Sequence, residues 1–221
     1  MQRYHTLYIL GTSHISIESV NQVKTFIEEE KPEIIAIELD RRRLQALFQR
    51  QKLRVSDIIR LGVKGFLFNL IGQYIEKKLG KLVGVSPGSE MKTAVKLAKK
   101  HGLKLALIDQ DITITLKRVS KAITWKEKFR FVKDILKGLI FRQSDIPSFD
   151  LRKVPSKEII KTMIEKVKKD YPNIHKVLIE ERNIYMAKAL TGLMDTYKNK
   201  KILAIIGAGH EEDIIKLVKR E

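Results

Sequence analysis

Short runs of apolar, β-prone residues alternate with helical patterns along this chain. The runs lie at about residues 6–10, 34–39, 105–108 and 202–206, and their length is typical of buried strands. Between them, apolar residues recur at the three-and-four spacing of amphipathic helices. This alternation predicts an α/β fold, with a mainly parallel central sheet of about four or more strands flanked by helices.

The same pattern predicts where helices begin and how the chain is organised. Ser16 is a typical N-cap for the first helix, which is expected to end near residues 31–32, and Asp40 is expected to cap the second. We predict one domain over residues 1–221, with basic helical insertions at about 55–86 and 112–145. Residues 143–155 contain two prolines and are expected to form a loop.

Composition narrows the function classes. The 221 residues are 43% hydrophobic, enough to bury a core, and the absence of cysteine excludes disulfides, thiolate metal sites and a cysteine nucleophile. A net charge of +18 favours anionic partners such as a membrane surface, nucleic acid or acidic peptides. Nucleic acid is the least favoured, because no nucleic-acid-binding motif accompanies the charge. The apolar positions of the insertions leave a homodimer open.

Two Gly-x-x-His motifs lie at opposite ends of the chain. Residues 11–14 read Gly-Thr-Ser-His and residues 207–210 read Gly-Ala-Gly-His, each directly after a predicted strand. The carboxyl ends of parallel strands share one sheet edge, so His14 and His210 are expected to come together there. A metal site would need this geometry, although each histidine could instead simply line a helix start.

Further polar residues follow the predicted strands. Alternation places Glu38 on the face of Ile34 and Ala36, where a buried carboxylate needs a cation, a metal or several hydrogen-bond donors. Asp109 follows the third strand, and Arg182 lies on the apolar face of a late helix, where it is expected to find a carboxylate. A structural ion pair and a catalytic site remain open for these residues.

Two common motif interpretations do not apply. Residues 207–209 read Gly-Ala-Gly after a strand, but Glu212 stands where a dinucleotide fingerprint needs its third glycine. There is also no His-Glu-x-x-His helix of the zincin type. Any metal site must therefore be assembled from segments distant in sequence.

Taken in order, the motifs resemble those of the TraB/PrgY family, which is similar to the Tiki metalloproteases. The likeness runs from residue 7 to about residue 218 and includes Glu-Leu-Asp at 38–40 with Arg43, Pro-Gly-Ser-Glu-Met at 87–91, Leu-Ile-Asp-Gln-Asp-Ile at 107–112 with Thr115 and Arg118, and Glu-Arg-Asn at 181–183, besides both Gly-x-x-His motifs. The chain departs from the family at Ser89, Gln110 and Asn183, where an acid, an arginine and an aspartate are usual.

The resemblance implies a metal-dependent hydrolase that acts on peptides. His14 and His210, with Glu90 or Glu181, are expected to hold a divalent ion such as Mn, Co or Zn. Glu38 would transfer the proton and Arg182 would stabilise the oxyanion. Supporting roles are expected for Asp40, Arg43, Asp109 and Arg118, with Asp109 orienting a histidine.

A non-catalytic peptide-binding or membrane-adaptor module is the alternative function. Archaeal and bacterial relatives often continue into hydrophobic spans, so we expect a cytoplasmic protein, such as the cytoplasmic part of an archaeal membrane protein cut before that region. The basic helices would then lie near an anionic lipid surface.

Overall fold

The computed structural model describes residues 1–13, 16–48, 88–141 and 154–220. Its strands are β1 (Gln2–Tyr4), β2 (Leu7–Thr12), β3 (Ile34–Ile37), β4 (Lys104–Leu107) and β5 (Ile202–Gly207). Its helices are α1 (Ile17–Glu30), α2 (Arg41–Phe48), α4 (Ser89–Lys100), α5 (Ile112–Ala122), α6 (Trp125–Phe141), α7 (Lys157–Asp170), α8 (Pro172–His175), α9 (Glu181–Thr196) and α10 (Glu211–Val218). A π-helical turn, η1 (Lys176–Glu180), joins α8 to α9.

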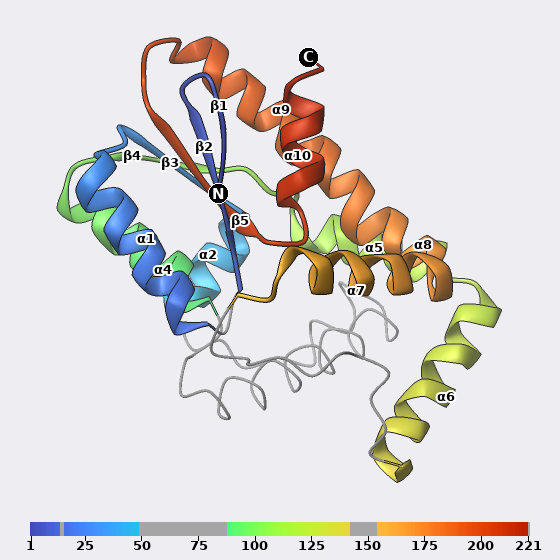
Figure 1. The fold of residues 1–221 in the computed structure, drawn as a ribbon. Helices are drawn as coiled ribbons and strands as arrows, with labels where there is room; N and C mark the ends of the chain where they lie inside the picture. Colours follow the sequence, from blue (N-terminus) through green and yellow to red (C-terminus); the bar gives the residue numbers. More distant parts are fainter. Residues whose placement is uncertain (14–15, 49–87, 142–153, 221) are drawn as a thin grey trace.

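The five strands form one mixed sheet in the order β1-β2-β5-β3-β4, and the α/β prediction is confirmed (Figure 1). Only β1 runs antiparallel to its neighbour, whereas β2, β5, β3 and β4 are parallel. The last strand of the chain therefore lies between the second and the third. This crossover makes β2, from the beginning of the chain, and β5, from its end, neighbours in the sheet.

Alternating side chains place one hydrophobic layer on each face of the sheet. On β5, Ile202, Ala204 and Ile206 pack against α9 and α10 on one face. On the other face, Leu203 and Ile205 pack with side chains of α1 and α4. Both faces are covered, which is why the parallel strands read as continuous apolar runs in the sequence.

Local capping explains where several helices begin. The Ser16 hydroxyl accepts a hydrogen bond from the Ser19 amide, so the predicted N-cap of α1 is confirmed. The Asp40 carboxylate accepts hydrogen bonds from the amides of Arg42 and Arg43 at 2.8 and 3.0 Å, as predicted for α2. Asp111 caps α5 in the same way.

In the region predicted as the second basic insertion, residues 112–145, the described part of the chain forms α5 and α6. The insertion at residues 55–86 lies outside the described residues, as does most of the loop predicted at 143–155. In the described part of the chain, no helix combines the length and the low polarity needed to cross a bilayer.

Candidate functional site

The two Gly-x-x-His motifs leave the sheet side by side. Their strands, β2 and β5, are neighbours, and Thr12 pairs with Gly207 at the carboxyl end of the ladder. Beyond it, the Ala208 amide donates to the Thr12 carbonyl at 2.9 Å. The structure therefore brings the motif loops together. His14 lies outside the described residues, so its contact with His210 stays a prediction.

Arg182 is the centre of a buried ion-pair network at this edge. Its Nη2 donates to Glu38 Oε1 and, at 2.6 Å, to Asp109 Oδ2. The carboxylate side chains of Glu38 and Asp109 are 4% and 0% exposed, and that of Arg182 is 13% exposed. Burial opposes the charge of Arg182, but the two carboxylates outweigh it and raise the pKa of the guanidinium. Arg182 thus stays charged in a nearly dry environment.

The π-helical turn before α9 positions Arg182. In η1 the Glu181 amide donates to the Lys176 carbonyl, five residues back, instead of four. Arg182 follows this turn directly, and its Nη1 donates to the Leu178 carbonyl at 3.0 Å. The guanidinium is therefore tied to its own helix on one side and to the strand ends on the other.

Glu38 connects β3 to the second Gly-x-x-His loop. Its Oε2 accepts a hydrogen bond from the Gly207 amide at 2.5 Å, while its own amide still donates to the Ile205 carbonyl on β5. Its side chain meets Arg182 of α9, which packs on the face that Ile34 and Ala36 share, as alternation predicts.

Arg43 and Asp40 extend the network away from Arg182. Arg43 Nη2 donates to Asp109 Oδ2 at 2.5 Å, and its Nε donates to Asp40 Oδ2 at 2.7 Å. Burial opposes the charge of Arg43 too, yet Asp109 and Asp40 raise the pKa of its guanidinium. With three carboxylates and two guanidinium groups, this network carries one net negative charge in its fully ionised form. A buried site of that charge favours a cation.

His210 has a defined tautomer, which its neighbours determine. Arg182 Nη1, which can only donate, lies 3.3 Å from His210 Nε2, so Nε2 carries the lone pair. Nδ1 therefore bears the proton and donates to Asn183 Oδ1 at 2.5 Å. Asn183 Nδ2 in turn donates to Asp213 at 3.3 Å, which fixes the orientation of the amide. The Nε2 atom also lies 3.5 Å from Glu38 Oε1.

The remaining predicted residues lie elsewhere. Glu181 forms a two-pronged ion pair with Arg118 at 2.5 and 2.6 Å, and its pKa is lowered by the hydrogen bonds from that arginine. Glu90 is buried in the first turn of α4. Among the residues that the structure describes, no three histidine, aspartate or glutamate side chains gather closely enough to hold a metal ion. A site with three such ligands therefore needs a side chain from outside them.

Two contacts were not anticipated from the sequence. Asp109 was expected to orient a histidine, but for His210 that partner is Asn183, and Asp109 is held by the two arginines. Asn183 directly follows Arg182 on the helix, and consecutive helical side chains point in different directions. Helical spacing therefore did not place Asn183 on the same face as Arg182. The only sequence signal that could have pointed to Asn183 was its place in the Glu-Arg-Asn motif.

The second contact joins Gly11 to Glu211: a Cβ atom on Gly11 would lie 2.4 Å from Glu211 Oε2.

The fold and this edge define a class of α/β protein in which segments distant in sequence, between residues 38 and 210, supply one buried polar network at the carboxyl ends of the strands. The model of the TraB/PrgY/gumN family matches residues 3–220, and the chain belongs to that family. An uncharacterized protein of Methanocaldococcus jannaschii is 36% identical over 97% of this chain and 53% of its own length. The TraB domain-containing proteins of Bos taurus and Homo sapiens are 26% and 25% identical, each over 83% of this chain and 51% of theirs. The chain thus spans about half the length of these relatives.

Proposed function

We propose that this chain is a metal-dependent hydrolase that acts on peptides, with its centre at His210, Glu38 and Arg182 and with His14 as a further metal ligand. The observation that carries the proposal is the hydrogen bond from His210 Nδ1 to Asn183 Oδ1. Metal-binding histidines usually donate their second ring N–H to an oxygen in this way, and this hydrogen bond orients the ring for binding through the other nitrogen. In His210 a bound ion would replace the contact between Nε2 and Arg182 Nη1.

The described residues fit a divalent cation in their chemistry. His210 Nε2 presents a lone pair beside a carboxylate oxygen of Glu38, and the ionised network around Arg182 is one charge negative. Nitrogen and carboxylate donors of this kind suit Mn, Co or Zn. A bound ion would lower the pKa of its water toward ~7 and so supply hydroxide at neutral pH.

Glu38 and Arg182 have complementary roles in this proposal. Glu38 would accept the proton of the attacking water at Oε1, next to His210 Nε2, and deliver it to the leaving amine. The Gly207 amide holds Oε2 and so fixes the carboxylate in place. Arg182, charged and nearly buried, would stabilise the oxyanion of the tetrahedral intermediate.

Calorimetric titration with Mn, Co and Zn tests the proposal. Wild-type protein is expected to bind one ion, and His14→Ala and His210→Ala are each expected to abolish binding while the fold is retained. His101→Ala is the matched control, because His101 is exposed at the end of α4. Glu38→Gln is then expected to lower metal-dependent peptide hydrolysis roughly 10²–10⁴-fold. Metal binding that survives both histidine substitutions would exclude this site.

The exposed face of α6 favours a second candidate function, a membrane-surface adaptor. Trp125 and Phe129 are 69% and 70% exposed, and their ring centroids are 6.2 Å apart. Lys128 lies over the Trp125 ring at 4.4 Å. Aromatic and basic side chains on one helix suit an anionic lipid surface. This function would be independent of hydrolysis, and the two are compatible in one chain.

A further inference from the structure

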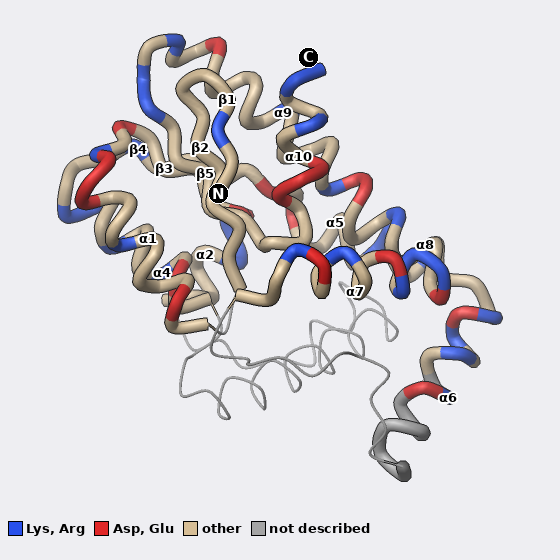
Figure 2. The backbone as a smooth tube through the Cα atoms, viewed as in Figure 1, with Lys and Arg blue, Asp and Glu red and all other residues tan. Residues whose placement is uncertain are grey.

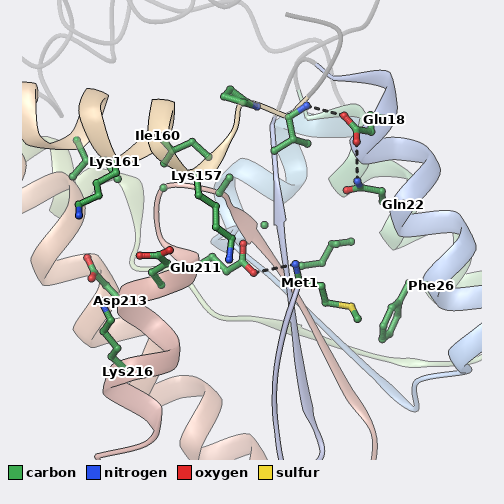
Figure 3. A pocket seen from close by; sticks show the side chains of 18 of the residues that line it. Met1, Glu18, Gln22, Phe26, Lys157, Ile160, Lys161, Glu211, Asp213 and Lys216 are labelled. Carbon is green, nitrogen blue, oxygen red and sulfur yellow. Dashed lines mark hydrogen bonds and ion pairs between the residues drawn. The ribbon is translucent and has the colours of Figure 1, made fainter. Parts of the chain in front are cut away.

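A large groove borders the two motif loops on the side of α1, α7 and α10. It has a volume of about 1440 Å³, and Gly11, Ala208 and Gly209 form part of its wall. Figure 3 shows Lys157, Ile160 and Glu211 among the side chains that surround it. Ala208 and Gly209 lie between Gly207, which binds Glu38, and His210. The groove therefore reaches the loop that carries the proposed metal ligand.

The lining of the groove is acidic although the protein is strongly basic. Its wall includes eight carboxylate side chains and four lysines, whereas the whole chain has a net charge of +18. Three of the carboxylates, Glu211, Glu212 and Asp213, occupy the first turn of α10, where Figure 2 shows a concentration of acidic residues. An acidic groove of this kind favours a cationic ligand over an anionic one.

Among the eight carboxylates named for this wall, Glu211 is the buried one. Glu211 is 7% exposed, and its Oε1 accepts no hydrogen bond from the described residues. Oε1 instead lies 3.3 Å from the α-ammonium group of Met1, an ion pair drawn in Figure 3. Its Oε2 lies so close to Gly11 that a Cβ atom there would be 2.4 Å away. The absence of a side chain at Gly11 therefore lets this carboxylate take its position beside the motif loop.

We propose that the groove binds the free α-amino end of a peptide and that Glu211 is the partner of its ammonium group. The contact with Met1 shows the chemistry that this carboxylate accepts, and an incoming peptide would replace Met1 there. An α-amino group has a pKa of about 7.7–8.0, so it is mostly charged at pH 7. This inference rests on the proposed peptide-hydrolase function, and it identifies the substrate class as peptides with an unblocked N-terminus.

Two peptides that differ only at the N-terminus provide the test. Leu-Ala-Leu-Ala amide and its N-acetyl form are titrated into wild-type protein, Glu211→Gln and Glu212→Gln. Glu212 lines the same groove and lies on the same turn, and Glu212→Gln removes the same charge, so that variant is the matched control. We expect the free amine to bind at least ten-fold more tightly than the acetylated peptide to the wild type and to Glu212→Gln. Glu211→Gln is expected to bind both peptides equally.

A second measurement keeps the test independent of how well Glu211→Gln folds. In protein labelled with ¹³C at the methionine methyl groups, the free-amine peptide is expected to shift the Met1 signal, and the acetylated peptide is not. Equal affinity of the wild type for both peptides, or no binding of either, would overturn the inference, as would selectivity that persists in Glu211→Gln. Hydrolysis of the same peptides with added Mn is assayed separately. Selective binding of the free-amine peptide without hydrolysis would refute the proposed enzyme and support amine recognition. Hydrolysis of both peptides without selective binding would support the proposed enzyme and refute amine recognition.

Discussion

Asn183 holds His210 through a 2.5 Å hydrogen bond between Oδ1 and Nδ1, and this bond orients the imidazole so that Nε2 lies 3.3 Å from Arg182 Nη1 and 3.5 Å from Glu38 Oε1. We predict that Asn183→Ala weakens metal affinity by roughly 10–100-fold, the usual effect of losing such a supporting partner. Calorimetric titration measures the affinity. Nitrogen NMR of His210 is expected to show the Nδ1–H tautomer in the wild type and a mixture of tautomers in the variant.

Asn183→Asp separates orientation from charge. An aspartate still accepts the hydrogen bond from Nδ1, so metal affinity is expected to recover relative to Asn183→Ala. The new carboxylate would lie near Asp213, whose oxygen is now 3.3 Å from the Asn183 amide nitrogen, and some loss of stability is expected from their repulsion. A wild-type tautomer and wild-type affinity in Asn183→Ala would contradict the role assigned to this residue.

Arg182→Met is predicted to destabilise the fold by about 3–5 kcal/mol, because it leaves Glu38 and Asp109 buried without their main cation. Chemical denaturation measures the free energy of unfolding. Adding Glu38→Gln to Arg182→Met is expected to recover part of the loss, since one unpaired charge is removed.

Two other arginines serve as controls for Arg182. Arg43→Met is expected to cost less, because Asp109 keeps its contacts with Arg182 and the Arg43 side chain is 27% exposed. Arg118→Met breaks a surface ion pair with Glu181, and it is expected to cost the least of the three substitutions, because solvent screens this pair. If Arg182→Met cost no more than Arg118→Met, the network would not be a buried electrostatic unit.

Glu127 links α6 to α8 and makes stability dependent on pH. It forms a capping box with Thr124 and accepts hydrogen bonds from the amide and the side chain of Asn173. Burial opposes its charge, but these hydrogen bonds outweigh that effect and lower the pKa of Glu127. Since the pKa is lowered by folding, the stabilisation is complete above the pKa of the unfolded state and is lost as the pH falls through the folded-state pKa.

Glu127→Ala is therefore predicted to destabilise the protein by about 1–3 kcal/mol at pH 7 and by less in acid. The free energy of unfolding from pH 7 down to pH 3 gives the comparison. Glu158→Ala, in the exposed first turn of α7, is the control and is expected to cost less than Glu127→Ala at pH 7. A loss for Glu127→Ala that stayed constant across this range would contradict the assigned ionisation.

Most of the sheet could be predicted from local pattern, but its order could not. The four predicted strands each agree with an observed strand to within about two residues. β1 was not predicted, because three residues are too few to show the apolar alternation of a strand. Its antiparallel pairing with β2 depends on tertiary contacts. The place of β5 between β2 and β3 depends on pairing across most of the chain, which no local pattern encodes.

In the candidate site, too, local sequence pattern predicted some contacts, whereas others depend on tertiary packing. Strand alternation and helical spacing were enough to predict that Glu38 and Arg182 each point into the protein, where the two side chains form an ion pair. They could not show that Arg182 also binds Asp109, or that Asn183 binds His210, because those contacts depend on how α9 packs against the strand ends. The π-helical turn before Arg182 changes the direction of the side chains that follow it. A prediction based on a regular 3.6-residue period cannot anticipate this change.

The aromatic pair on α6 gives a test of membrane association. Trp125 and Phe129 are exposed, and Lys126, Arg130 and Lys133 are exposed on the same helix. Trp125→Ser combined with Phe129→Ser is predicted to lower binding to phosphatidylserine-containing vesicles, because the apolar area that enters the interface is lost. Vesicle co-sedimentation measures the bound fraction.

Salt and lipid charge separate the two contributions to this binding. Each basic residue near an anionic surface contributes about 1 kcal/mol, so binding is expected to fall as salt rises and to be weak on phosphatidylcholine alone. Ile184→Ser combined with Tyr185→Ser, at two exposed apolar positions on α9, is the matched control and is expected to bind like the wild type. Equal loss in both double variants would mean that general surface hydrophobicity drives the binding. Binding unaffected by salt or by phosphatidylserine would contradict the electrostatic part of the prediction.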